Sequence, residues 1–448
     1  MRKKICTFLL VAILFFSGCN GAYETAELTE RDIFLASLTR EDFIYDVDYM
    51  LAALEENFPS FGIIYTRNGV DMAQLGQNIR EYIANEDNEM DFYRFLDVLS
   101  FDYFGHAHPI GHLHPLRTAI MFEAVLGNLR TFAELDPNFR LFSNVFANPA
   151  TMLIYPPLSQ KDAAFLAEAF AGENNLTTEI IEDGRIGYVH IRTFATTIDD
   201  NDRAVMNRFF DDIAGFEHLI IDIRGNTGGF VPFFDELIAG PLIDRQLSDT
   251  LHHFVMDGGH NMEFLRATGT IVHHRGGGAA ALDRTARIAE EFGLTLPTQP
   301  PRQTEAESNW NPTPHFLDEY AHHTDPFDYF FLDQRFVEPS EWRERSGFDG
   351  RVWMLTDGYN FSAAQMVAEF YKNTGFATLV GETTGGAVPA PWGSNFFALP
   401  NTGIVIRYDP TFVTNRYGRP LEYGTQPHYF NRPGMDALET AVAMIGEQ

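Results

Sequence analysis

Residues 352–371 read VWMLTDGYNFSAAQMVAEFY, and this stretch carries the most information about the architecture. Its pattern predicts a strand, a tight turn and a helix whose first residue is Ser362. A serine at a helix start places its hydroxyl at the positive end of the helix dipole, beside N–H groups that could hold a developing oxyanion. Serine is also favoured there as a helix cap, so this stretch alone leaves a catalytic and a structural role open.

A glycine pair follows a second apolar strand. Residues 218–222 predict a buried strand, residues 222–229 read DIRGNTGG, and a helical stretch follows at residues 233–238. Two adjacent glycines at a strand end permit backbone conformations that turn N–H groups outward, as an oxyanion hole requires. A glycine turn beside an ion pair between Asp222 and Arg224 is the structural alternative, and the segment alone leaves both open.

The rest of the chain supports an α/β fold with a small helical N-terminal domain. Short apolar runs alternate with helical segments, which is the pattern of a sheet buried between helices. The chain has 448 residues and exceeds the size at which one hydrophobic core stops growing, so a main domain plus at least one smaller one is expected. The predicted strands are residues 188–191, 218–222, 351–355, 376–380 and 403–407.

Helical spacing of apolar residues, and breaks in that spacing, define the expected domain boundaries. We predict a helical N-terminal domain at residues 41–115, a connecting region at 116–184 with no evident PDZ module, and an α/β domain at 185–448. The α/β domain is interrupted at about 245–345 by a segment of little periodicity, interpreted as an insertion that covers or borders a cleft. Its eight histidines are predicted to lie at the surface: His252, His253, His260, His273, His274, His315, His322 and His323.

The first residues predict export. A basic start is followed by an apolar run at residues 7–16 and by a Ser-Gly-Cys sequence that ends at Cys19, the layout of a secretory signal. The run is far shorter than the roughly 20 residues that span a bilayer. The sequence resembles a bacterial lipoprotein signal, with residues 1–18 removed, Cys19 acylated and residues 19–40 serving as a tether; an ordinary secretory signal is the alternative. The predicted location is the cell envelope, outside the cytoplasm, on a lipid anchor.

Charge and cysteine content exclude several classes of protein. Loss of residues 1–18 would leave 29 of the 32 Lys and Arg residues against 62 Asp and Glu residues, a formal charge of −33. Such a surface repels phosphate backbones and anionic lipid headgroups, so we expect no nucleic-acid partner and membrane contact through the lipid alone. Cys6 would leave with the signal, so the mature chain would keep Cys19 alone and form no internal disulfide.

Four histidines lie in a loop at residues 104–115, which read FGHAHPIGHLHP. They are His106, His108, His112 and His114. A neutral imidazole is suited to accept a proton from a serine hydroxyl. Two of the four are spaced as in some metal sites, but the proline and glycine between them oppose a continuous helix, and neither a cysteine nor a close glutamate completes a ligand set. We therefore predict no metal site and no cofactor.

Together these segments resemble the C-terminal processing (tail-specific) peptidases, a family that includes the tricorn core. The family's landmarks occur here in the family's order: the strand at residues 188–194, DIRGNTGG at 222–229, FSAAQ at 361–365, LVGETTGG at 379–386 and LEYGTQP at 421–427. The resemblance is loose over residues 41–113 and close over 185–446, apart from the insertion. It implies a crotonase-like α/β fold and hydrolysis of peptide bonds by a serine nucleophile.

The resemblance also implies roles for individual residues. Ser362 matches the nucleophile, and the backbone amides of Gly228 and Ala363 match the oxyanion donors, each of which typically contributes on the order of a hundredfold in rate. Glu422 matches a glutamate that orients the base or contacts substrate in those members whose base is a histidine. An exposed carboxylate at a strand end is the structural alternative for Glu422.

Members of the family use either a lysine or a histidine as the base. The lysine is expected near residues 386–391, which contain none, so the histidine arrangement is favoured. Residues 110–113, IGHL, are most similar to the family's histidine segment and favour His112 as the base. Spacing from the preceding helix favours His106 or His108 instead, and these alternatives stay open.

The sequence thus predicts an exported serine endopeptidase that acts on peptides or proteins. A noncatalytic lipoprotein that uses the same cleft to bind a peptide or an apolar ligand is the alternative, because retinoid-binding relatives share the fold. The 41 phenylalanines permit an apolar pocket, although they are equally expected in a hydrophobic core.

Overall fold

The computed structural model describes most of the chain outside its N-terminal signal and the insertion. The described residues are 28–108, 110–135, 142–170, 175–195, 197–268, 273–274, 329–340, 342–343, 346–391 and 393–447. The predicted signal, Cys19 and residues 275–328 lie outside them. Among the described residues, no helix is both long enough and apolar enough to cross a membrane.

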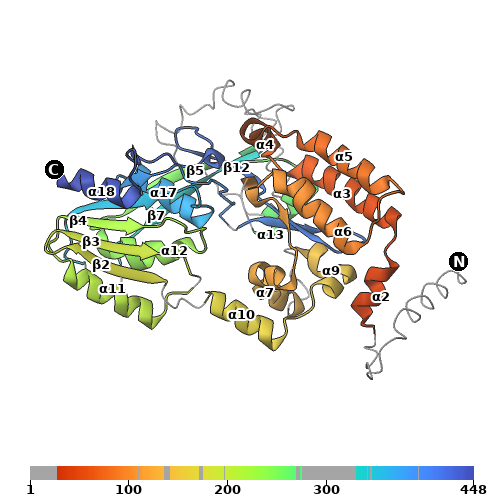
Figure 1. Cartoon of the computed structure of the whole chain (residues 1–448), viewed down its shortest axis with the longest axis horizontal. Helices are drawn as coiled ribbons and strands as arrows, with labels where there is room; N and C mark the ends of the chain where they lie inside the picture. Colours follow the sequence, from red (N-terminus) through yellow and green to blue (C-terminus); the bar gives the residue numbers. More distant parts are fainter. Residues whose placement is uncertain are drawn as a thin grey trace, which may run out of the picture.

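Helices form the N-terminal part of the structure, as predicted (Figure 1). Helix α3 begins with a capping box in which Thr39 and Asp42 exchange hydrogen bonds between side chain and backbone. The apolar faces of the helices bury Phe43, Leu54 and Phe95 in one core. The helices are α2 (Glu30–Ser37), α3 (Arg40–Asn57), α4 (Phe61–Asn68), α5 (Met72–Ala84), α6 (Phe92–Asp97) and the irregular η1 (Val98–Tyr103). Helix α2 lies within the segment predicted as a tether.

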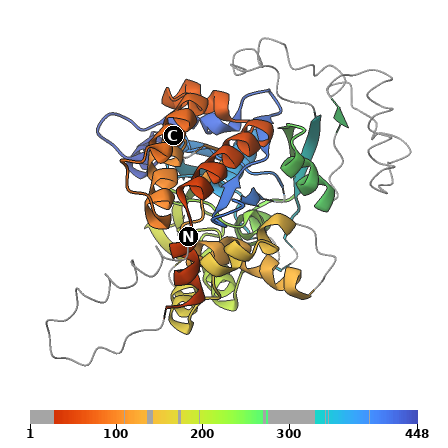
Figure 2. The same cartoon turned by 90° about the vertical axis from the view of Figure 1, so that its right-hand side faces the viewer.

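The connecting region is also largely helical. Its helices are α7 (Ala119–Leu135), α8 (Ser143–Phe146), α9 (Pro149–Ile154) and α10 (Gln160–Phe170). Figure 2 views the molecule from the helical end, with the N-terminal helices in front of the C-terminal strands. Figure 1 shows the N-terminal helices at one end of the molecule and the central sheet at the other.

A six-stranded mixed sheet forms the α/β part, with the strand order β13-β9-β8-β4-β3-β2. All neighbours are parallel except β2 and β3. The strands are β2 (Leu176–Glu182), β3 (Ile186–Ile191), β4 (His218–Asp222), β8 (Arg351–Thr356), β9 (Ala377–Gly381) and β13 (Tyr429–Phe430). One face is covered by α11 (Asp200–Asp212), α12 (Val231–Phe234) and α17 (Ala363–Asn373), and the other by α18 (Ala437–Gly446) (Figure 1). The predicted α/β fold with a helical N-terminal part is confirmed.

Two smaller antiparallel sheets complete the structure, with the orders β12-β5-β7-β6 and β1-β11-β10. Their strands are β1 (His114–Pro115), β5 (Leu247–Val255), β6 (His273–His274), β7 (Tyr329–Val337), β10 (Asn395–Ala398), β11 (Val405–Tyr408) and β12 (Thr411–Asn415). The strand predicted at 403–407 forms as β11, but it does not join the central sheet. Its apolar side chains pack into the core of the N-terminal helices instead.

The predicted insertion begins with a buried strand rather than with irregular surface. Strand β5 lies between β12 and β7, so both of its edges are paired. His252 and His253 on this strand are buried, and the prediction that these two lie at the surface is wrong. The His253 ring stacks on Phe331 with centroids 4.6 Å apart, and burial lowers its pKa to about 3, so it is neutral.

Candidate active site

The candidate nucleophile lies in a strained turn between β8 and α17. Helix α17 begins at Ala363, so Ser362 precedes the helix instead of being its first residue, as the sequence predicted. The Ser362 backbone has φ 52° and ψ −123°, which costs a non-glycine residue on the order of 1–3 kcal/mol. Its side chain makes no capping hydrogen bond, so the role of a helix cap does not explain this serine.

The glycine pair packs against the nucleophile. A Cβ atom on Gly228 would lie 2.9 Å from Ser362 Cβ and 3.0 Å from Ala363 N, so a larger residue does not fit there. The Ala363 N–H has no acceptor among the described residues, which leaves it available as an oxyanion donor. The Gly228 N–H donates to Asn226 Oδ1 at 2.8 Å, so the role predicted for it as a second donor requires that hydrogen bond to open.

His112 is held by a buried carboxylate that the sequence analysis did not identify. Its Nδ1 lies 2.7 Å from Oδ2 of Asp409, whose side chain is 1% exposed. Because an ionised carboxylate only accepts hydrogen bonds, Nδ1 carries a proton and Nε2 is left to accept one. Asp409 directly follows β11, which pairs with β1 next to the histidine loop. The two residues are 297 positions apart, and no motif in the sequence links them.

Glu422 bridges the histidine loop and the segment beside the nucleophile. It lies in the short helix η6 (Leu421–Tyr423) and is 3% exposed, so it is not an exposed carboxylate at a strand end. Its Oε2 accepts hydrogen bonds from Gly111 N at 3.4 Å and from Ala387 N at 3.2 Å. The contact is with the backbone before His112 and not with its ring.

Backbone strain concentrates around these residues. Within the described part of the chain, four non-glycine residues have positive φ: His112, Phe142, Ser362 and Ala387. Ser362 N donates to Gly386 O at 3.2 Å, so Ala387 follows a direct neighbour of the serine. Strain persists where surrounding contacts over-determine it, and hydrogen bonds of Glu422 and Gly386 link the segments of His112, Ser362 and Ala387. This clustering indicates that the site's geometry is fixed by the fold.

Burial raises the pKa of the Glu422 carboxyl to about 8, and the nearby Asp409 adds to the rise. The amides that bind Glu422 and the Arg67 guanidinium oppose it. Arg67, from helix α4, donates to the backbone oxygens of Gly385 and Glu422 and thereby ties the helical part to the site. At neutral pH Glu422 is therefore largely protonated and uncharged.

Glu422→Gln is expected to remove a pH dependence from the stability of the protein. The folded-state pKa of about 8 lies above the ordinary 4.5, so the folded protein retains a proton that the unfolded chain releases. The free energy of unfolding should therefore fall as pH rises through this window, by about 1.4 kcal/mol per pH unit, and the variant should lack this fall. Urea unfolding of both proteins across the window measures it, and parallel stability curves would contradict the expectation.

The other histidines of the loop lie in different surroundings. His106 and His108 are exposed, but the His108 ring packs edge-on against Phe361 with centroids 6.2 Å apart, beside the nucleophile. Burial lowers the pKa of His114 to about 4, and its Nδ1 contacts the carbonyl of the next residue. Among the described residues no imidazole hydrogen-bonds to Ser362 Oγ, and catalytic hydrogen bonds often tighten only when substrate is bound. Across all the residues that the structure describes, no group of three or more His, Cys, Asp or Glu side chains could hold a metal ion.

The ion pair considered as a structural alternative for the DIRGNTGG segment is also present. Arg224 pairs with Asp222 at 2.7 Å, and Tyr188 donates to the same carboxylate at 2.8 Å. These residues line an open cleft of about 520 Å³ beside the carboxyl ends of β3, β4 and β8. The segment therefore combines an ion pair at its start with a glycine against Ser362 at its end, and the two interpretations do not exclude each other.

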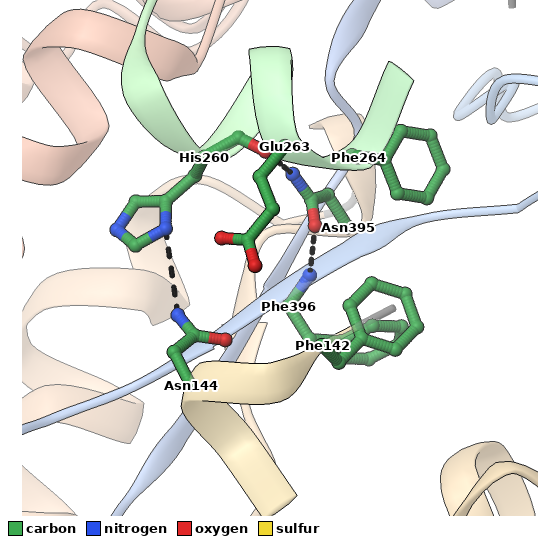
Figure 3. A pocket seen from close by; sticks show the side chains of 7 residues that line it. All are labelled: Phe142, Asn144, His260, Glu263, Phe264, Asn395 and Phe396. Carbon is green, nitrogen blue, oxygen red and sulfur yellow. Dashed lines mark hydrogen bonds between the residues drawn. The ribbon is translucent and has the colours of Figure 1, made fainter. Parts of the chain in front are cut away.

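A second, much smaller cavity of about 10 Å³ lies between α8, α13 (Gly259–Ala267) and β10 (Figure 3). Asn144 and His260 face each other there, with Nδ2 and Nδ1 3.4 Å apart, and Asn395 donates to the His260 carbonyl at 3.0 Å. A volume of this size holds about one water molecule. This cavity is therefore too small for a substrate.

Comparison with known proteins agrees with the fold. The model of peptidase family S41 matches residues 185–430, more than half of the chain. In structure the chain resembles a putative peptidase from Parabacteroides merdae, with a TM-score of 0.50 at 16% sequence identity over 90% of this chain and 96% of that chain. It is also similar to mature CPAF complexed with lactacystin (TM-score 0.49, 13% identity, 91% and 97% covered) and to a photosystem II D1 C-terminal processing protease (TM-score 0.39, 13% identity, 91% and 98% covered). Among curated proteins, none matches this sequence. The matched segment includes Gly228, Ser362 and Glu422, and the chain belongs to peptidase family S41.

Proposed function

We propose that this chain is a serine endopeptidase in which Ser362 is the nucleophile and His112 is the base. One observation carries the proposal: Ser362 is held in a strained, uncapped conformation beside a free Ala363 N–H. Glu422 joins the segment next to this serine to the loop whose His112 is fixed through its Nδ1. A structural serine at a helix start would use its hydroxyl as a cap. The membership of family S41 supports the same chemistry.

The proposed reaction follows from these positions. Ser362 Oγ attacks the carbonyl carbon of a peptide bond while His112 Nε2 takes the hydroxyl proton. The negative charge that forms on the carbonyl oxygen is stabilised by the Ala363 N–H, and by the Gly228 N–H once it leaves Asn226. Collapse of the intermediate breaks the C–N bond, and the imidazolium returns the proton to the leaving amine. Water then hydrolyses the acyl-enzyme by the same steps.

We also propose where the chain acts and which residue is the alternative base. The substrates are peptides or proteins outside the cytoplasm, and the chain reaches them after export, anchored through a lipid on Cys19. The anchor is supported by the sequence of the first 19 residues alone. His108 is the alternative base, because its ring packs against Phe361, the residue before Ser362.

A fluorophosphonate probe tests the nucleophile directly. The mature protein is expected to form a covalent adduct on the peptide that contains Ser362, and Ser362→Ala is expected to form none, with mass spectrometry locating the adduct. Absence of Ser362-dependent labelling at any pH between about 5 and 9 would favour the noncatalytic binding protein instead.

A further inference from the structure

Two buried carboxylates lie near His112, and they are bound by different groups. Glu422 is bound by backbone amides, whereas Asp409 is bound by side chains. Oδ2 of Asp409 accepts from His112 Nδ1 at 2.7 Å, and Oδ1 accepts from Ser394 Oγ at 2.8 Å. Ser394 Oγ in turn accepts from Arg407 Nε at 2.9 Å. His112 therefore ends a hydrogen-bonded chain of four side chains.

The backbone fixes the same pairing independently. In the β1–β11 ladder His114 lies opposite Arg407, and Asp409 N donates to Gly111 O at 2.7 Å. These bonds set Asp409 beside the residue that follows Gly111, which is His112. The backbone of Asp409 cannot move away from the histidine loop unless these backbone hydrogen bonds open. Support from both backbone and side chains is what holds a catalytic group in a productive geometry.

The charges around the pair favour an ionised Asp409 and a neutral Glu422. Burial alone would raise the pKa of Asp409, but His112 and Arg407 beside it hold that pKa below its ordinary value. Burial raises the pKa of Glu422 to about 8 and lowers the pKa of His114 to about 4, so both are largely uncharged at neutral pH. An imidazolium that forms at His112 therefore faces the fixed negative charge of Asp409.

We propose that Asp409, and not Glu422, is the positioning residue for the base. It holds His112 in the tautomer whose Nε2 accepts the Ser362 proton, and it stabilises the imidazolium that results. Glu422 joins the backbone segments that carry the base and the nucleophile. Ser394 and Arg407 fix Asp409 in turn. This inference rests on the proposed function, and it differs from the family resemblance, which implies the acidic role for Glu422.

The second-order rate of fluorophosphonate labelling, measured on the full mature chain across pH, tests the proposal. Asp409→Asn preserves size but removes the charge and favours the wrong tautomer of His112. The labelling rate at neutral pH is expected to fall by about 10³–10⁴-fold. The acidic limb of the rate profile is expected to move to lower pH, because the imidazolium loses its counter-charge. Ser394→Ala, which removes one hydrogen bond to Asp409, is expected to cost about tenfold.

Asp46→Asn is the matched control. Asp46 is also buried and accepts from Thr402 N and Thr402 Oγ1, each at 2.7 Å, and from Asn401 N, and neither residue belongs to the proposed site. Its variant is expected to label at the unaltered rate per folded molecule, with the folded fraction measured by circular dichroism. A readout independent of activity is a downfield Nδ1–H proton in the NMR spectrum, which should disappear in Asp409→Asn and persist in Glu422→Gln.

The outcomes separate this inference from the proposed function. If Ser362-dependent labelling exists but Asp409→Asn keeps both the rate and the pH profile, the role of Asp409 is overturned and the serine mechanism stands. Loss of the Nδ1–H signal in Glu422→Gln with retention in Asp409→Asn would also overturn it. If the unaltered protein shows no Ser362-dependent labelling, the proposed function fails and this inference fails with it.

Discussion

Ser362→Ala, His112→Ala and the double variant are expected to lower kcat for peptide hydrolysis by the same factor, on the order of 10⁶-fold. The reason is that the serine is a weak nucleophile without a base, and the base has nothing to deprotonate without the serine. Residues that act as one unit therefore show losses that do not add. Steady-state hydrolysis of a fluorogenic peptide by the four proteins, at equal folded concentration, measures the cycle.

His108→Ala is the control for this cycle. Its imidazole belongs to the same loop and packs against Phe361, but no hydrogen bond from a described residue fixes its ring. A loss of about tenfold or less is expected, from disturbed packing beside the nucleophile. If His108→Ala matches Ser362→Ala while His112→Ala retains activity, the base is His108. If the losses of Ser362→Ala and His112→Ala multiply in the double variant, Ser362 and His112 do not act as a catalytic pair.

Gly228→Ala is expected to lower the labelling rate of Ser362 by about 10²–10³-fold, because the added methyl group occupies the space of the nucleophile's backbone. The new Cβ would lie 2.9 Å from Ser362 Cβ and 3.0 Å from Ala363 N, so the serine and the oxyanion donor must both shift. Positive φ at Gly228 adds strain to any residue with a side chain. The labelling rate with the fluorophosphonate probe measures the effect.

Gly225→Ala provides the matched control for backbone strain. Gly225 also has positive φ, 75°, but a Cβ there would meet nothing within 4 Å. This variant should lose stability, by about 1 kcal/mol, and label at close to the unaltered rate. Equal losses of labelling in the two variants would mean that strain in the turn, and not contact with Ser362, sets the requirement for glycine.

Local patterns in the sequence account for much of the fold and for one side of the site. The run before Ser362 forms β8, the turn and α17 because apolar spacing and the glycine turn act over a few residues. The helices of the N-terminal part follow from the same spacing, and Gly228 of the DIRGNTGG segment lies against the serine. These features depend on neighbours in the chain, which a single sequence displays.

Features set by tertiary pairing could not be predicted in the same way. An apolar run at 403–407 indicates a strand, but not whether it joins the central sheet or the β1–β11 ladder. The sequence of β5 does not alternate between apolar and polar residues, because most of this strand is buried and two of its buried residues are histidines. The pattern typical of a half-buried strand is therefore missing. Asp409 was missed for the same reason, since a single aspartate after a strand has no signature until the ladder places it against His112.

The ladder between β1 and β11 also has a consequence for the growing polypeptide. Ribosomes make His112 before Asp409, which follows it by 297 residues. Until β11 has docked, His112 lacks the carboxylate of Asp409, so a nascent or truncated chain lacks part of the proposed site. Under the proposed export and function, a chain translocated before it folds would complete its proposed site only outside the cytoplasm.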